Sequence, residues 1–238
     1  GGNRIHTDYR VHAAFGNTTS LDFTGTDSIF VGYEWHVHTS NTSVNMGNCV
    51  IKMGPFANHF TFNGGNSTYA DIDVENTSTG SHNVNFSHNN IYGDIDVIAY
   101  GTQNVNFYNN STYGDVTVDY TKVANTSSTP RIHGLNAFDS FDLTVSGTLK
   151  PNLYIDQDNT FGTLSVASGT NVYMGNNRTQ TVDNLVAVGE CLRRITLQSF
   201  NDGNTTTISS SAGTINADWL ILEDITAVSY THLRAHET

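Results

Sequence analysis

The sequence has few charged residues and few bases. Asp, Glu, Lys and Arg make up 13% of its 238 residues, about half the ~25% that is usual in soluble globular domains. Ten Lys and Arg residues stand against 22 Asp and Glu residues, which gives a net charge of −12. This charge repels phosphate backbones and anionic lipid surfaces, so we expect no nucleic-acid partner.

Long apolar runs and paired cysteines are also missing. No stretch approaches the ~20 consecutive apolar residues that a membrane-spanning helix needs, so the sequence predicts no membrane insertion. The two cysteines, Cys49 and Cys191, match no zinc or redox spacing. In an elongated fold they would lie far apart, and we expect no disulfide bond between them.

Uncharged polar residues supply most of the polarity that is present, because Asn, Thr and Ser together number 80. Such a composition can signal disorder. However, aromatic residues make up 11% of the chain, and Val, Ile, Leu and Phe recur at regular spacing. This is more apolar surface than a solvated linker carries, so the chain is predicted to fold.

The clearest internal repeat has a period of 21 residues. Segment 83–97 reads NVNFSHNNIYGDIDV and segment 104–118 reads NVNFYNNSTYGDVTV. Looser copies begin at His59, Arg131 and Asn152. Each unit contains two short runs in which apolar and polar residues alternate, and this period of two is typical of β-strands.

A unit of about 21 residues with two short strands cannot bury its apolar face alone. Stacking the units at ~4.8 Å lets each backbone pair with the copies above and below it. The sequence therefore predicts an all-β fold, a parallel β-helix or β-solenoid with rungs of about 20 to 25 residues, and almost no helix. The alternative is an antiparallel sandwich of hairpins, which near-identical consecutive units disfavour.

Stacked rungs would align like residues into columns. Asn-rich turns are predicted to form hydrogen bonds between rungs and to tolerate left-handed backbone; they are 89–90, 109–110 and 176–177. Three glycines precede the second strand of their units at the same offset, as bends that need glycine would: Gly93, Gly114 and Gly162.

The chain divides into three parts. Residues 1–58 alternate like β-strands without a clear repeat and are predicted to be an irregular β segment, early rungs or a cap. Residues 59–227 form the predicted solenoid. The last part, 228–238, reads VSYTHLRAHET and resembles the translation of a tagmentation sequencing adapter at every position, so we expect it to be an artefact and interpret none of its residues.

Several short blocks near the C-terminal end carry a resemblance to a known protein family. They are Ile195–Ser199, Gly203, Thr207–Ser209, Gly213–Asn216, Asp218 and Glu223–Asp224. Over the stretch from Cys191 to Ala227, the sequence thus resembles the adhesin-like β-solenoid repeat proteins of Bacteroidetes and related bacteria. The resemblance implies secretion, a right-handed solenoid and an extracellular or cell-surface location. It brings no catalytic residues.

The most specific candidate site is a column of aspartates, each directly before an apolar residue of the second strand: Asp71, Asp94, Asp115 and Asp142. Carboxylates stacked at ~4.8 Å would repel by roughly 0.9 kcal/mol per pair even at the dielectric constant of water. A bound Ca²⁺, which prefers several oxygen ligands, would relieve that repulsion. The sequence predicts a Ca²⁺ ladder here, with a solvated bend that simply suits Asp as the alternative.

Two further patterns leave alternatives open. An aromatic column stands three residues before the second strand and either stacks inside the core, which is favoured, or faces outward to bind sugar rings: Tyr69, Tyr92, Tyr113 and Phe161. His36 and His38 share one face of a regular strand and offer two metal ligands. No third ligand is apparent, so exposed strand histidines are the favoured interpretation.

These observations favour a non-enzymatic repeat segment of a secreted bacterial surface or adhesin-like protein. It would serve as a spacer or as an adhesion surface for glycans or other surface proteins, with no cofactor other than Ca²⁺. The alternative is a carbohydrate-active or glycan-binding parallel β-helix, in which acidic groups or Ca²⁺ and a Lys or Arg base share a groove. None of the three lysines, Lys52, Lys122 and Lys150, falls in the aspartate column, so we expect no enzyme.

Overall fold

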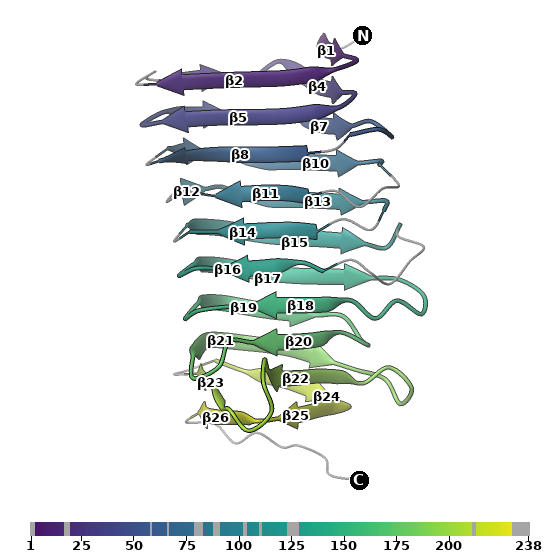
Figure 1. Cartoon of the computed structure of the whole chain (residues 1–238), viewed down its shortest axis with the longest axis vertical. Helices are drawn as coiled ribbons and strands as arrows, with labels where there is room; N and C mark the ends of the chain where they lie inside the picture. The colour runs from purple at the N-terminus through teal and green to yellow at the C-terminus, as the bar shows by residue number, and fades with distance from the viewer. Residues whose placement is uncertain are drawn as a thin grey trace.

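The computed structural model describes residues 3–16, 20–57, 59–65, 67–78, 83–87, 91–101, 104–109, 111–122, 129–210 and 213–229. All regular structure in these residues is β-strand. The chain coils into a parallel β-solenoid of about nine turns with rungs of about 23 residues, seen along its length in Figure 1. The predicted fold class is therefore confirmed, while the right-handed coil stays a prediction.

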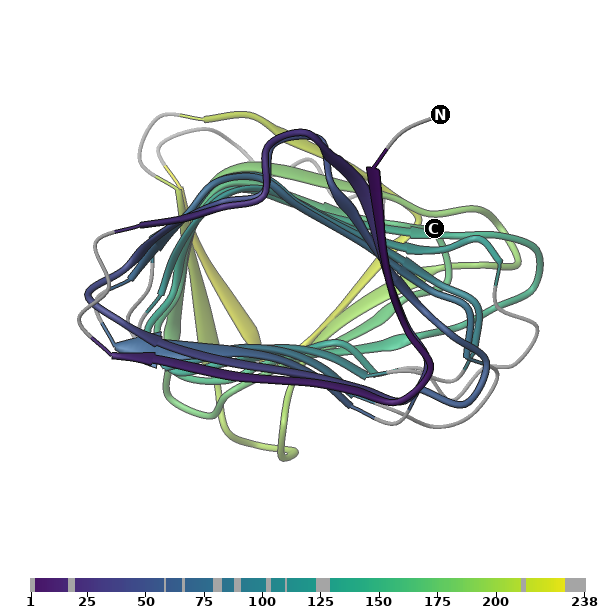
Figure 2. The ribbon, with the colours of Figure 1, turned by 90° about the horizontal axis from the view of Figure 1, so that it is seen from above.

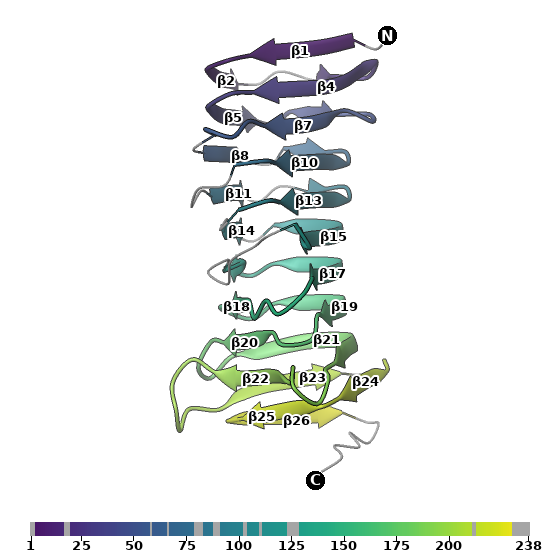
Figure 3. The ribbon, with the colours of Figure 1, turned by 90° about the vertical axis from the view of Figure 1, so that its right-hand side faces the viewer.

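Two parallel sheets run the length of the solenoid (Figures 1 and 3). Eleven stacked strands form the main path of sheet A: β1 (Asn3–Thr7), β4 (Thr26–Val31), β7 (Val50–Met53), β10 (Ile72–Asn76), β13 (Ile95–Ala99), β15 (Thr112–Tyr120), β17 (Ala137–Val145), β19 (Thr160–Val166), β21 (Thr179–Val188), β23 (Thr206–Ser210) and β26 (Ile225–Ser229). Sheet B has ten: β2 (Arg10–Gly16), β5 (Glu34–Ser40), β8 (His59–Gly65), β11 (Asn83–Ser87), β14 (Asn104–Tyr108), β16 (Arg131–His133), β18 (Asn152–Ile155), β20 (Asn171–Met174), β22 (Ile195–Ser199) and β25 (Leu220–Glu223). Five short strands join sheet A beside its main path: β3 (Ser20–Asp22), β6 (Ser43–Asn45), β9 (Thr68–Tyr69), β12 (Ile91–Tyr92) and β24 (Ile215–Asp218).

Strands of successive rungs pair in parallel. In the 21-residue repeat, β11 pairs with β14 so that Val84 lies beside Val105 and Phe86 beside Phe107. The second strands of the same units, β13 and β15, pair in the same way. This parallel pairing excludes the antiparallel sandwich, in which neighbouring strands would run in opposite directions.

Residues 3–16 and 20–57 form rungs of the same stack. In sheet A, β1 pairs with β4, β4 with β7, and β7 with β10. In sheet B, β2 pairs with β5 and β5 with β8. At the other end, Val228 and Ser229 belong to β26 and lie beside Ser209 and Ser210; the rest of the predicted adapter segment, 230–238, lies outside the described residues.

Alternate residues of the strands point inward and form one apolar core along the axis of the solenoid. Figure 2 shows the backbone viewed along this axis from one end. The predicted aromatic column lies inside this core and continues through Phe138, which the sequence analysis missed. Its rings stack from rung to rung with centroids 4.8 to 5.2 Å apart: Tyr69, Tyr92, Tyr113, Phe138 and Phe161. Burial raises the pKa of Tyr69 to about 12. The inward interpretation of the column is confirmed.

The two cysteines occupy different environments. Cys49 is buried in the core, whereas Cys191 is exposed. Both are free thiols, which confirms that no disulfide bond joins them.

Polar residues close one corner of the solenoid from inside. Each buried side chain in this corner ladder accepts a hydrogen bond from the backbone N–H of the preceding rung. Asn136 Oδ1 accepts from Ser111 at 3.1 Å, Asn159 Oδ1 from Asn136 at 3.0 Å, and Gln180 Oε1 from Asn159 at 3.2 Å. These bonds satisfy backbone donors that the bend takes out of the sheet.

The predicted Asn turns contribute in part as expected. Asn109 and Asn177 adopt left-handed backbone, with φ of 65° and 54°. Asn176 accepts a hydrogen bond from Ser199 in the next rung at 2.8 Å. Residues 89, 90 and 110 lie outside the described residues.

Glycine is needed before the second strand for a reason other than the predicted one. Gly93 and Gly114 do not have positive φ. Instead, a Cβ on Gly93 would lie 2.5 Å from Oδ1 of Asp71, and one on Gly114 would lie 2.6 Å from Oδ1 of Asp94. At these two positions the requirement is space for the carboxylate and the backbone of the preceding rung, whereas a Cβ on Gly162 would lie 2.4 Å from the backbone carbonyl oxygen of Asp139.

Candidate functional site

Three of the four predicted aspartates lie one above the other on the outer surface of sheet A. Asp71, Asp94 and Asp115 directly precede paired positions of β10, β13 and β15. The backbone N–H of Asp94 donates a hydrogen bond to Oδ1 of Asp71 at 3.1 Å, and that of Asp115 donates to Oδ1 of Asp94 at 2.9 Å. The hydroxyl of Ser140 donates to Oδ1 of Asp115 at 2.7 Å. Each carboxylate therefore holds the following rung in place.

The fourth predicted member, Asp142, does not belong to this column, and that part of the prediction is wrong. It pairs with Thr117, two residues beyond Asp115. The prediction counted back from Leu143, whereas the inward residue that opens this part of β17 is Phe141. A slip of two residues leaves every apolar side chain on the same face, so the alternation could not reveal it.

Ca²⁺ binding by the remaining three aspartates stays a prediction, which the unfolding temperature in millimolar Ca²⁺ checks.

A second acidic row runs beside the first. Asp73 pairs with Asp96 across β10 and β13. Burial raises the pKa of Asp73, and the charges of Asp96 and Asp71 raise it further. This part of sheet A therefore presents closely spaced negative charge.

Lys52 lies on the outside of sheet A in an ion pair. Its Nζ lies 2.7 Å from Oε2 of Glu75, and this hydrogen bond lowers the pKa of Glu75. The hydroxyl of Tyr100 donates to the other carboxylate oxygen of Glu75 at 3.1 Å. Lys52 thus stabilises a neighbouring rung through a carboxylate outside the aspartate column.

The two histidines predicted to share a face do lie side by side on the outer surface of sheet B. The Nε2 atoms of His36 and His38 are 2.6 Å apart. His12 in the preceding rung pairs with His36, and Oε1 of Glu34 lies 3.7 Å from Nδ1 of His36. One potential ligand atom from each of His12, Glu34 and His36 lies within 4.8 Å of the other two.

Sequence reasoning missed His12 and Glu34 for different reasons. Glu34 stands two residues before His36 in one strand, so period-two alternation already placed it on the same face. His12 lies 24 residues before His36, in a part of the chain without a clear repeat. Only the pairing of β2 with β5 brings it to the site.

Partly buried aromatic rings on the outer face occupy another part of sheet B. Tyr154 and Tyr173 stack with centroids 4.9 Å apart, and the guanidinium of Arg131 lies 5.0 Å from the centroid of Tyr154. Because Arg131 and Tyr173 come from the rungs on either side, they cover both faces of Tyr154. The cluster presents this ring to solvent by its edge, whereas sugar recognition by stacking uses the ring face.

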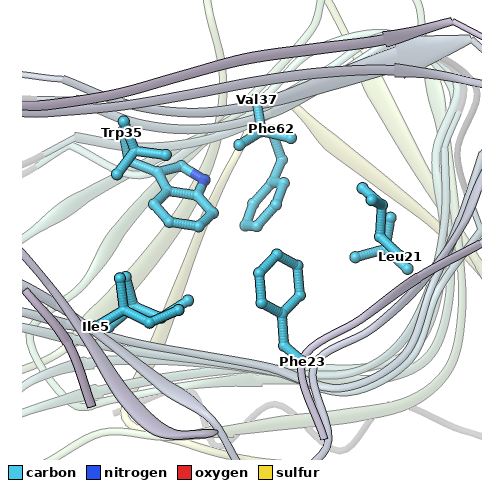
Figure 4. Close-up of a pocket in the computed structure, with 9 residues that line it drawn as sticks. Ile5, Leu21, Phe23, Trp35, Val37 and Phe62 are labelled. Atoms are coloured by element: carbon cyan, nitrogen blue, oxygen red, sulfur yellow. The ribbon is translucent and has the colours of Figure 1, made fainter.

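Two cavities lie at the ends of the apolar core. The first is at the N-terminal end. Figure 4 shows its Phe23 and Phe62 rings in the middle, with Ile5 and Trp35 on one side and Leu21 on the other. The second is lined by apolar residues of the last rungs, with Leu185, Leu220 and Ile225 among them. Both are lined by the side chains that fill the interior elsewhere, so they are continuations of the core.

Comparisons with protein-family models, with curated proteins and with solved structures found no match. Within the described residues, no helix has the length and apolar character needed to cross a membrane.

Proposed function

We propose that this chain is a non-enzymatic repeat segment of a secreted bacterial surface protein, acting as a spacer or as an adhesion surface. The observation that carries the proposal is the unbroken stack of parallel rungs around one core. About nine turns at ~4.8 Å per rung give a rod roughly 40 Å long, whose length is set by the number of rungs. Such a body projects or separates other parts of a protein.

The surface chemistry supports an extracellular setting. The lateral faces carry Asn, Thr, Ser and Asp, and hydrogen bonds between rungs engage many of these side chains, as between Asn152 and Asn171. The C-terminal segment resembles adhesin-like solenoids of secreted bacterial proteins, as described above. Glycans or other surface proteins are the proposed partners.

Glycan recognition is favoured by one local feature, the partly exposed cluster of Arg131, Tyr154 and Tyr173. Its hydroxyl groups and guanidinium can donate hydrogen bonds to sugar hydroxyls. With both faces of Tyr154 covered, the cluster suits weak contact along a polysaccharide better than a deep binding site.

The proposal is tested on a panel of immobilised polysaccharides by measuring both retention of the protein and release of soluble sugar. We expect no release of sugar from any member of the panel. Retention of the protein without release of sugar identifies an adhesion surface, and absence of retention identifies a spacer. Both results agree with a non-enzymatic role. Release that is proportional to protein concentration contradicts the proposal.

A matched pair of variants identifies the part of the surface that is responsible for any retention on the polysaccharides. Tyr154→Ala with Tyr173→Ala removes the partly exposed rings, whereas Asn85→Ala with Asn106→Ala truncates an inter-rung pair on the same sheet. We expect the tyrosine variant to lose retention and the asparagine variant to keep it.

A further inference from the structure

The histidine and glutamate group at the N-terminal end of sheet B can bind a metal ion, which goes beyond the proposed function. We propose that His12, Glu34 and His36 form a binding site for a divalent transition metal of the zinc type. Two ligands come from β5 and the third from β2, which pair residue for residue. The site therefore joins two rungs across one inter-strand spacing of ~4.8 Å.

The distances match what such an ion requires. Two ligands bound to one tetrahedral zinc at 2.0–2.1 Å lie about 3.3 Å apart. Nδ1 of His36 and Oε1 of Glu34 are 3.7 Å apart, so a shift of a few tenths of an ångström brings both onto one ion. The ring of His12 lies 4.7 Å from that of His36, centroid to centroid, and nearly perpendicular to it.

His38 supports the site through a hydrogen bond. Its Nε2 is 2.6 Å from Nε2 of His36, which is too close for two ligands of one tetrahedral zinc but is a short hydrogen-bond distance. With Nδ1 of His36 on the metal, Nε2–H of His36 donates to His38. A ligand histidine that donates its other N–H to an acceptor is the usual arrangement at zinc sites.

Arg10 holds the carboxylate from the other side. Its Nε lies 3.0 Å from Oε2 of Glu34, which leaves Oε1 directed toward His36. Arg10 itself packs over the rings of Tyr9 and Tyr33. The carboxylate is thereby positioned for binding through one oxygen.

The ligand set selects the class of metal. Two imidazoles and one carboxylate suit Zn²⁺ and its neighbours in the first transition row, whereas Ca²⁺ and Mg²⁺ prefer oxygen ligands throughout. Three protein ligands leave a fourth position on the ion. Because His36 retains 28% of its side-chain exposure and His12 is exposed, that position faces solvent.

The test measures zinc binding by isothermal titration on the full chain without a polyhistidine tag. The parent protein and every variant in this test also carry His232→Gln, His236→Gln and Cys191→Ser. These changes remove three other potential zinc ligands, namely two histidines outside the described residues and one exposed thiol. We expect one Zn²⁺ per chain, and visible absorption bands of tetrahedral Co²⁺ when cobalt replaces zinc. His12→Gln, Glu34→Gln and His36→Gln should each weaken zinc binding by more than about tenfold.

His133 provides a matched control on the same sheet. Its Nδ1 lies 2.9 Å from Oδ2 of Asp156, and this pair belongs to no three-ligand group of the described residues. His133→Gln should leave the zinc affinity unchanged. Circular dichroism in the presence of EDTA verifies that each variant is folded. Absence of zinc binding by the parent protein, or equal affinity in the parent and all three ligand variants, overturns the proposal.

Discussion

Oδ1 of Asp71 accepts a hydrogen bond from the backbone N–H of Asp94 in the next rung at 3.1 Å. The same oxygen fills the space where a side chain at position 93 would stand. The repeated Gly-Asp pair is therefore one structural unit, in which glycine makes room for the carboxylate that binds the following backbone.

Gly93→Ala is expected to lower the free energy of unfolding by about 1 to 3 kcal/mol, because the new methyl group overlaps Oδ1 of Asp71 and nearby backbone atoms. Urea denaturation measures the change. Gly65→Ala is the control, since a Cβ there meets nothing within 4 Å. In the double variant with Asp71→Ala, part of the loss should be recovered; strict additivity would contradict the carboxylate contact.

Asn136→Ala is expected to cost about 1 to 3 kcal/mol of unfolding free energy. Asn136 is buried, and its removal leaves the backbone N–H of Ser111 without its acceptor at the corner. Asn152→Ala serves as the control, because Asn152 is only partly buried and accepts from Asn171 at 3.2 Å. Equal losses in the two variants would contradict a special role for the corner ladder.

Phe107→Ala is expected to cost about 3 to 5 kcal/mol, the range for deleting a buried aromatic ring. Phe107 is fully buried and contacts the rings of Phe86, Tyr113 and Phe141. Phe56→Ala, at a ring that is 80% exposed, should change stability by no more than about 0.5 kcal/mol. Thermal and urea unfolding of both variants provide the comparison.

Asp73→Asn is expected to stabilise the protein at neutral pH by at most about 1 kcal/mol, a small gain because solvent screens a partly exposed group. The pKa of Asp73 is raised by burial and then by Asp96 and Asp71. The folded state therefore binds this proton more tightly than the unfolded state, and the wild-type chain loses stability as pH rises from the unfolded pKa through the folded one.

The advantage of Asp73→Asn should disappear at pH values below the ordinary pKa of Asp, where the wild-type carboxyl is protonated in both states. Urea denaturation of the two proteins across this pH range measures the difference. Asp202→Asn, in an exposed turn, removes the same charge outside the acidic rows of Asp71 and Asp73. A gain at neutral pH of the same size in that control would contradict the local cause.

Much of the fold was predictable because the sequence repeats its local chemistry. Period-two alternation assigned Val84 and Phe86 to the interior, and near-identity of the two units aligned them with Val105 and Phe107. Among the site residues, the same alternation placed His36 and His38 on one face. Alternation and repetition are local signals that require no knowledge of the loops.

The sequence by itself determined the β-solenoid, the interior aromatic column and the stacking of Asp71, Asp94 and Asp115. Only the tertiary structure decided that Phe141 rather than Leu143 follows Val116 in its column and that His12 lies beside His36. The reason is that hydrophobic alternation specifies a face but not a register. A shift by two residues buries the same side chains, so the pairing of complete rungs decides which residues meet across them.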